Sequence, residues 1–137
     1  MAGYLKRWRN YIVSDYEFEM PWPPTVNHYH QPVRMGKGVR IIKGQKAKQY
    51  AIEMESYLAE IGIANEKIPE DKILSMHLTL KPPTLVKYDV DNRTKGVMDA
   101  LSNANFYADD SQIHRLTIEK GEKVKGGSIT VKINIIE

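Results

Sequence analysis

The segment 89–95 places two carboxylates and an amine at a spacing that could bind a metal ion. Asp89 and Asp91 are two residues apart where an extended stretch runs into a helix, and in extended backbone such residues point to the same side. Two adjacent carboxylates repel each other unless a cation lies between them. Oxygen ligands of this kind favour Mg²⁺ or Mn²⁺ over zinc. Lys95, one helical turn after Asp91, could pair with the carboxylates or reach a phosphate bound to the metal.

Two other interpretations of this segment have to be weighed. A calcium-binding EF-hand loop is excluded, because its sixth position needs glycine and its twelfth an acid, whereas Thr94 and Ala100 occupy those positions. The ordinary structural interpretation stays open. In it, Asp91 caps a helix, Asp89 belongs to a turn and Lys95 forms an ion pair on the surface.

A second acidic pair, Asp109 and Asp110, follows the second predicted helix. A helix of about 12 residues and a short return strand can bring this pair back toward the helix N-terminus. Three carboxylates, a lysine and a metal ion are the components of a phosphodiester hydrolase. The metal lowers the pKa of a bound water, and the lysine stabilises the negative charge that builds up on the phosphate.

The positive charges lie apart from these aspartates. The net charge is only +3, but no acidic residue occurs between Glu19 and Glu53. Six cations fall in that gap, namely Arg34, Lys37, Arg40, Lys43, Lys46 and Lys48. A basic segment with interleaved aromatic residues favours nucleic-acid binding, because cations neutralise phosphates and aromatic rings stack on bases. A solvated basic loop with scattered surface acids is the alternative.

Length and composition exclude several classes of protein. A chain of 137 residues fits one domain, and 42% apolar residues suffice for a core without disulfides or a structural metal. The absence of cysteine excludes a thiolate zinc site and a cysteine nucleophile. No apolar run is long enough to cross a membrane or to act as a signal peptide. We therefore expect a soluble, cytoplasmic protein without a small-molecule cofactor.

Hydrophobic periodicity predicts the elements that position these residues. Strands are expected over residues 16–20, 73–80, 113–120 and 128–136, and a helix over 45–61. A second helix is expected to begin near Asp91 or Asn92, both good N-caps. The stretch 25–44 reads as a long loop or a loose hairpin, and residues 1–14 as an N-terminal extension of the domain 15–137. The order β-α-β-α-β-β predicts a two-layer α+β domain, a mixed sheet with both helices on one face.

Several motifs occur in order along residues 15–137. They are MPWPPT at 20–25 with Asn27 and Tyr29, DVDN at 89–92 with Lys95, DAL at 99–101, Phe106 through Asp109 and Asp110, and KGG at 125–127. Together they resemble the RusA family of Holliday junction resolvases. Their combined order and spacing are specific, although any one motif alone would not be.

This resemblance implies a homodimeric, Mg²⁺-dependent endodeoxyribonuclease that binds four-way DNA junctions and nicks two strands symmetrically in DNA recombination and repair. Mn²⁺ is expected to substitute for Mg²⁺. The metal-binding aspartates of the family map to Asp89, Asp91 and Asp110, and its essential lysine maps to Lys95. These four residues form the predicted catalytic set. Asp109 matches the acidic neighbour of the third ligand.

We expect DNA contacts from residues on the basic segment and beside the site, namely Asn27, Tyr29, Arg34, Lys37, Arg40, Lys43, Lys87 and Lys125. The sequence departs from the family pattern in the basic residues that would bind DNA beside the site. Some family members carry a run of arginines before the paired aspartates, where this chain has LVKY at 85–88 and only Lys87 is basic. Two alternatives remain open: a module that binds branched DNA without cutting it, and a nuclease that acts on forks or flaps.

Overall fold

The computed structural model of the chain describes residues 7–8, 11–12, 14–24, 30–35, 38–43 and 45–136, with side chains for 14–24 and 46–136. The chain divides into two compact units. The first consists of Met1–Trp22, Asp71–Val86 and Ser111–Glu137, and the second of Pro23–Glu70 and Lys87–Asp110. No helix in the described ranges is long and apolar enough to cross a membrane.

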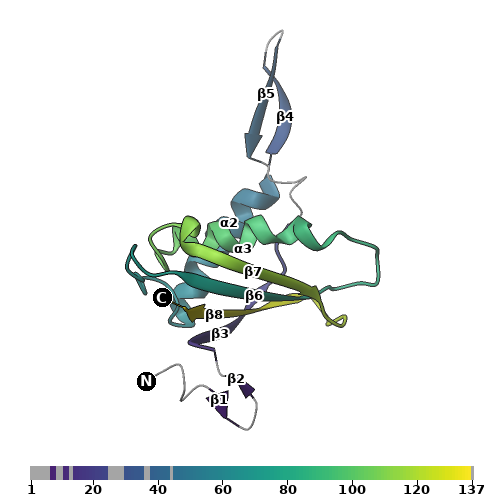
Figure 1. The fold of residues 1–137 in the computed structure, drawn as a ribbon. Coiled ribbons are helices and arrows are strands. Elements are labelled where there is room, and N and C mark those ends of the chain that lie inside the picture. Colours follow the sequence, from purple (N-terminus) through teal and green to yellow (C-terminus); the bar gives the residue numbers. More distant parts are fainter. Residues whose placement is uncertain are drawn as a thin grey trace. The chain divides into compact units, whose positions relative to one another are not determined.

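The first unit is built on a four-stranded mixed sheet (Figure 1). Its strands, in spatial order, are β3 Tyr16–Pro21, β8 Ser128–Ile135, β6 Leu74–Lys81 and β7 Ile113–Lys120. Only the pair β6–β7 is parallel; β3–β8 and β6–β8 are antiparallel. All four predicted strands and the mixed sheet are therefore confirmed. A short pair, β1 Arg7–Trp8 and β2 Tyr11–Ile12, lies within the predicted N-terminal extension.

Alternating burial explains why these strands could be read from the sequence. Every second residue of β6 is buried, from Leu74 to Leu80, because successive side chains of a strand point to opposite faces of the sheet. The edge strand β3 ends at Pro21, and an edge tolerates a residue without a backbone N–H group. Asp15 fixes the start of β3, because its carboxylate accepts a hydrogen bond of 2.8 Å from the Ile135 N–H group.

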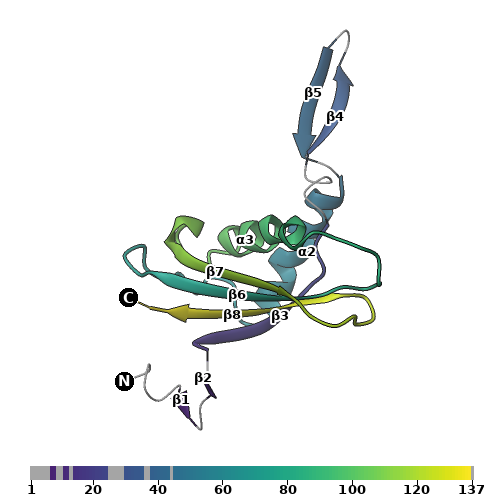
Figure 2. The same cartoon turned by 45° about the vertical axis from the view of Figure 1, so that its right-hand side comes forward.

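The second unit contains two helices and a hairpin (Figure 2). Helix α2 spans Gln45–Glu60 and contacts helix α3, which spans Thr94–Asn103 and follows the 3₁₀ helix η2, Val90–Arg93. Strands β4 His30–Met35 and β5 Gly38–Lys43 pair antiparallel, which confirms the hairpin interpretation of that stretch. The helix predicted over 45–61 is also confirmed. The placement of both helices on one face of the sheet stays a prediction.

Gly127 shapes the turn before β8. Its φ angle is 72°, and a Cβ atom there would meet the Trp22 side chain and the Pro83 ring at 2.9 Å. The turn that contains Trp22 can therefore pack against this loop only because residue 127 has no side chain. The KGG and MPWPPT motifs, which are more than 100 residues apart in the sequence, meet at this contact.

This contact leads to a prediction about stability. Gly127→Ala should lower the free energy of unfolding by about 1–2 kcal/mol for the left-handed backbone and by about 1–3 kcal/mol more for the overpacked contact. Gly126→Ala is the matched control, because its φ angle is 78° but nothing lies within 4 Å of the place that a Cβ atom would take. In urea unfolding, Gly126→Ala should show only the loss of about 1–2 kcal/mol that comes from the left-handed backbone. Equal losses in the two variants would contradict the packing role of Gly127.

Candidate active site

The paired aspartates lie at the surface of the second unit, at the start of η2. Asp89 is in extended conformation, with φ −90° and ψ 142°, and its carbonyl accepts a 3.3 Å hydrogen bond from the Asn92 N–H group. Asp91 lies inside the 3₁₀ helix, and both aspartates are exposed. Only Asp89 is extended, because the 3₁₀ helix begins at Val90. The expectation that an extended backbone points Asp89 and Asp91 to the same side is therefore not met.

The second helix begins close to the predicted place, but neither of the predicted residues caps it. Helix α3 begins at Thr94, and its N-cap residue is Arg93, which forms no capping hydrogen bond through its side chain. The 3₁₀ turn over residues 90–93 delays the helix, so that neither Asp91 nor Asn92 occupies the N-cap position. Asp89, the N-cap of η2, likewise makes no capping bond with its carboxylate. Helix capping therefore does not account for this pair of aspartates.

Lys95 is held by an aspartate outside the predicted catalytic set. Its Nζ atom lies 3.2 Å from Oδ2 of Asp99, one helical turn further along α3. The Lys95 side chain is 52% exposed, so this ion pair adds little to stability. In the structure, the pair directs the Lys95 amine toward Asp99. The i,i+4 spacing of the two residues is the sequence signal that could have indicated this pair.

Tyr107 connects α3 with the second acidic pair. The residue is 2% exposed, and its hydroxyl donates a hydrogen bond of 3.1 Å to the Met98 carbonyl. Burial strongly raises the pKa of the phenol, and the nearby carboxylates of Asp110, Asp99 and Asp109 raise it further. The negative charges of all three carboxylates therefore act on this hydroxyl. No pattern in the sequence indicated this role.

Arg93 anchors η2 to the proline-rich turn. Its Nη1 atom donates a hydrogen bond to the Pro23 carbonyl, which is 70 residues away in the sequence. Burial lowers the pKa of this guanidinium, and the neighbouring Tyr88 acts in the opposite direction. The bond therefore links the 3₁₀ helix that contains Asp91 to Pro23 of the MPWPPT motif. Sequence reasoning missed this residue because the contact is long-range.

The oxygen donors suit a hard divalent cation. Within residues 14–24 and 46–136, no three Asp, Glu, His or Cys side chains come close enough together to hold a metal ion. Mg²⁺, however, is usually bound by only one or two protein carboxylates and keeps several of its waters. The carboxylates of Asp89 and Asp91 are exposed, and neither is used to cap a helix, so they fit that requirement. The joint binding of one ion by Asp89, Asp91 and Asp110 stays a prediction.

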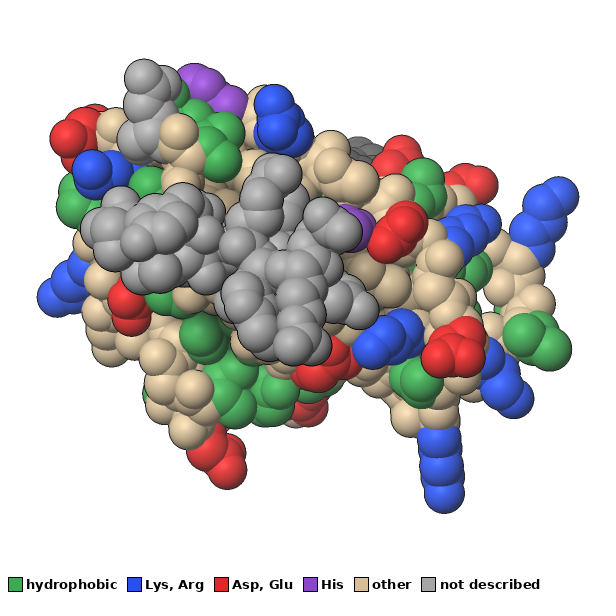
Figure 3. All heavy atoms as spheres, turned by 60° about the horizontal axis from the view of Figure 1, so that its bottom comes forward, with side chains coloured by type: hydrophobic (Ala, Val, Ile, Leu, Met, Phe, Trp, Pro, Cys, Tyr) green, Lys and Arg blue, Asp and Glu red, His purple; other side chains and the backbone are tan. Residues whose placement is uncertain are grey.

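The expected DNA contacts are distributed over several segments. Arg34, Arg40 and Lys43 lie on the β4–β5 hairpin, where Arg34 pairs with Val39 and Lys43 with His30. Lys87 and Lys125 are exposed. The remaining candidates, Asn27, Tyr29 and Lys37, lie outside the described residues. On the face drawn in Figure 3, the coloured basic and acidic side chains are interspersed. The positions of these residues do not test whether they contact DNA, so the expected DNA contacts stay predictions.

Comparisons with known proteins match nearly the whole chain. The family model described as endodeoxyribonuclease RusA matches residues 21–135. The crossover junction endodeoxyribonuclease of Enterobacteria phage HK97 is 26% identical over 125 residues, which are 91% of this chain and 98% of that protein. The proteins of the same name from Escherichia coli K12 and Enterobacteria phage 82 are 28% identical over 122 residues, 88% of this chain and 95% of theirs. The part matched by the family model includes both acidic pairs and Lys95.

Proposed function

Because this chain belongs to the RusA family of endodeoxyribonucleases, we propose that it is a Mg²⁺-dependent enzyme that cuts four-way DNA junctions by paired, symmetric nicks. The relatives named above are crossover junction endodeoxyribonucleases, and the chain aligns with almost their full length. The observation that carries the proposal is the exposed pair Asp89 and Asp91, which helix capping does not use, beside the Lys95–Asp99 ion pair. DNA recombination and repair in the cytoplasm is the process that such an activity serves.

Each residue of the site has a distinct task in this mechanism. Asp89 and Asp91 would hold Mg²⁺, and Asp110 would complete the ligand set only if its carboxylate moved toward that pair, because no three such side chains among those described lie close enough as the structure stands. The ion would supply a bound water of lowered pKa and neutralise charge on the phosphate, and Mn²⁺ would substitute. The Lys95 ammonium donates to the phosphate oxygen as negative charge builds up. Asp99 orients that ammonium. Tyr107, whose pKa is raised, stays protonated and keeps its bond to the Met98 carbonyl, so it acts as a support and not as a base.

The DNA is held by cations outside the reacting centre. The hairpin residues Arg34, Arg40 and Lys43 neutralise backbone phosphates on either side of the cut, together with Lys87 and Lys125. A homodimer with two-fold symmetry would present two active sites to a junction that also has two-fold symmetry, which accounts for paired nicks. Sedimentation equilibrium should accordingly give a mass of two chains of 15.7 kDa.

The proposal is tested by incubating the protein with end-labelled four-way, fork, flap and duplex DNA of matched sequence, with and without Mg²⁺. We expect nicks only with the metal, at symmetric positions, and fastest in the four-way junction. Junction binding without nicks at any metal or salt concentration would favour the alternative of a non-cleaving module. Faster cleavage of forks or flaps would favour the alternative of a nuclease that is specific for those structures. Both alternatives use the same basic surface, so binding alone does not separate them.

Arg93 gives a further prediction, because its bond to Pro23 holds the turn that carries Asp91. In Arg93→Gln, cleavage at limiting Mg²⁺ should fall by about 10- to 100-fold, the usual loss when a residue that supports a metal ligand is changed. Saturating Mg²⁺ should restore much of the rate, because the ligands themselves are intact. The control is Arg115→Gln, an exposed residue of β7. An unchanged Mg²⁺ requirement in Arg93→Gln would contradict this positioning role.

A further inference from the structure

Two adjacent apolar side chains are exposed in the segment that follows β6. Leu85 is 86% exposed and Val86 is 72% exposed, which are the highest values for large apolar residues among the described side chains. A single exposed apolar residue is ordinary on a protein surface. Two neighbours that lie almost entirely in water are less so, because burying both against a partner would be favourable. These two residues, which we call the apolar pair, are therefore a candidate contact surface.

The backbone around the apolar pair is held by hydrogen bonds. The Pro82 carbonyl accepts a bond of 3.0 Å from the Val124 N–H group, and the Thr84 hydroxyl accepts one of 3.3 Å from the Val86 N–H group. In Figures 1 and 2, the segment after β6 runs beyond the end of that strand. A fixed turn thus presents both side chains to solvent, so the contact surface exists before a partner binds.

The charges near the apolar pair favour DNA as the partner. Lys87 follows the pair directly and is exposed. Lys125, also exposed, follows Val124, whose N–H group binds the Pro82 carbonyl. Cations beside an apolar surface match a polyanion that also has apolar surfaces. DNA is such a partner, because the faces of its base pairs are apolar and lie between two phosphate backbones.

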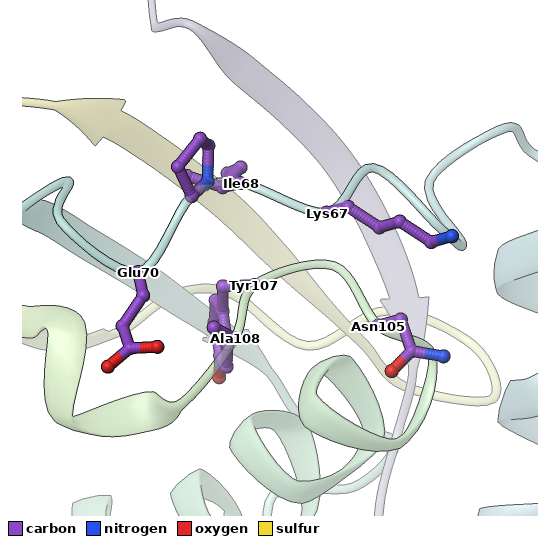
Figure 4. Close-up of a pocket in the computed structure, with 7 residues that line it drawn as sticks. Lys67, Ile68, Glu70, Asn105, Tyr107 and Ala108 are labelled. Atoms are coloured by element: carbon purple, nitrogen blue, oxygen red, sulfur yellow. The ribbon is translucent and has the colours of Figure 1, made fainter.

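A pocket on the second unit is less suited to DNA (Figure 4). It has a volume of about 360 Å³ and lies between the segments 67–70 and 105–108. The Glu70 carboxylate lies on one side of Tyr107 and the Asn105 amide on the other. A carboxylate at the rim repels phosphates, whereas the residues on either side of the apolar pair bring positive charge. The apolar pair is therefore the better candidate for a contact with DNA.

Base-pair faces are accessible at a branch point but not within a duplex. Inside a duplex, an apolar side chain enters only after neighbouring base pairs unstack, which costs free energy. At a branch point the continuous stack is interrupted, so the end of a stack can be reached without that cost. Asp89 lies three residues after Val86, so their Cα atoms are at most about 11 Å apart. At a rise of about 3.4 Å per nucleotide, the apolar pair lies within a few nucleotides of a phosphate bound at Asp89.

We propose that Leu85 and Val86 pack on the face of a base pair at the branch point, and that this contact gives junction binding a component that salt does not weaken. The inference rests on the proposed function, because it takes a four-way junction as the substrate. The attraction between cations such as Lys87 and phosphates falls as the salt concentration rises, because binding releases counterions. Apolar burial releases no counterions, so the two components of binding respond differently to salt.

The test uses one double variant and two controls. Leu85→Ser combined with Val86→Ser removes the apolar surface and leaves every charge in place. Lys87→Gln removes one charge next to the pair. Ile52→Ser changes another exposed apolar side chain, which is 65% exposed on α2. All the substituted residues are exposed, and thermal unfolding checks that each variant is folded.

Dissociation constants are measured for a four-way junction and for a duplex of matched sequence, without Mg²⁺, from about 50 to 200 mM NaCl. The double variant should bind the junction at least about 10-fold more weakly at every salt concentration, and its affinity for the duplex should not change. In Lys87→Gln, the slope of log K against log salt concentration should fall by about 0.9, because one phosphate contact is lost. Ile52→Ser should bind like the unsubstituted protein.

An unchanged junction affinity in the double variant, or an equal loss of affinity for the duplex, overturns the inference. A loss that disappears at high salt also overturns it, because the contact would then be electrostatic. Nicking assays with Mg²⁺ test the proposed function separately. If the double variant loses the salt-independent component but the unsubstituted protein never nicks a junction, only the proposed cleavage fails. If the unsubstituted protein binds the junction no more tightly than the duplex, both fail.

Discussion

Asp91→Asn is expected to abolish cleavage of four-way junctions while junction binding is kept or strengthened. The substitution removes a negative charge and weakens a hard-metal ligand, but it keeps the size of the side chain. Changing residues that merely support a metal ligand costs about 10- to 100-fold, so loss of the ligand itself should exceed about 100-fold. Binding should not suffer, because one carboxylate that repels the phosphate backbone has been removed. Single-turnover cleavage and gel-shift titration on the same junction measure the two effects separately.

Asp71→Asn is a suitable control, since Asp71 is an exposed aspartate in a turn of the first unit. It makes the same change of charge without touching the candidate site, and it should cut junctions at the rate of the unsubstituted protein. If Asp91→Asn also cuts at that rate, the assignment of the site is wrong. If Asp91→Asn loses binding together with cleavage, its carboxylate has a structural function and not the proposed catalytic one.

Lys95→Met should lower junction cleavage by about 10²- to 10³-fold, the usual cost of removing one group that stabilises charge in a transition state. The ammonium is the only charged group that the substitution removes, and the long apolar stem is largely kept. Binding of Mg²⁺ should not weaken, because Lys95 is a cation and contributes nothing to the ligand set. Cleavage rates measured over a range of Mg²⁺ concentrations therefore separate this variant from Asp91→Asn.

Asp99→Asn extends this test to the partner of Lys95. If the 3.2 Å ion pair only directs the ammonium, cleavage should fall by about 10-fold, the lower limit for residues that support a reacting group. The exposed i,i+4 pair is worth about 0.3–0.5 kcal/mol, so stability should hardly change. Asp71→Asn, which removes the same negative charge, is the control for Asp99→Asn, and Lys72→Met, at an exposed lysine of the first unit, is the control for Lys95→Met. A loss in Asp99→Asn as large as in Asp91→Asn would instead identify Asp99 as a metal ligand.

The strands and the first helix could be predicted because each carries a complete local pattern. Strand β6 has one buried face, so its apolar residues alternate, and α2 buries one stripe that includes Met54 and Leu58. The start of α3 could not be predicted in the same way. Asp91 and Asn92 are good N-caps by local preference, but the carbonyl of Asp89 closes a 3₁₀ turn there, and Arg93 bonds to the distant Pro23. The observed start of α3 thus coincides with the long-range bond between Arg93 and Pro23, which local residue preferences could not predict.

The sequence by itself determined which residues could do chemistry: two pairs of aspartates, a lysine one turn after the first pair, and a basic segment that forms a hairpin. Residue type and spacing were sufficient for that, because the side chains concerned are neighbours along the chain. Only the tertiary structure decided that Gly127 packs on Trp22, that Arg93 binds Pro23, and that a pocket opens between the segments 67–70 and 105–108. These features join residues about 40 to 105 positions apart, and their positions depend on the path of the whole backbone, which no local pattern of residue types encodes.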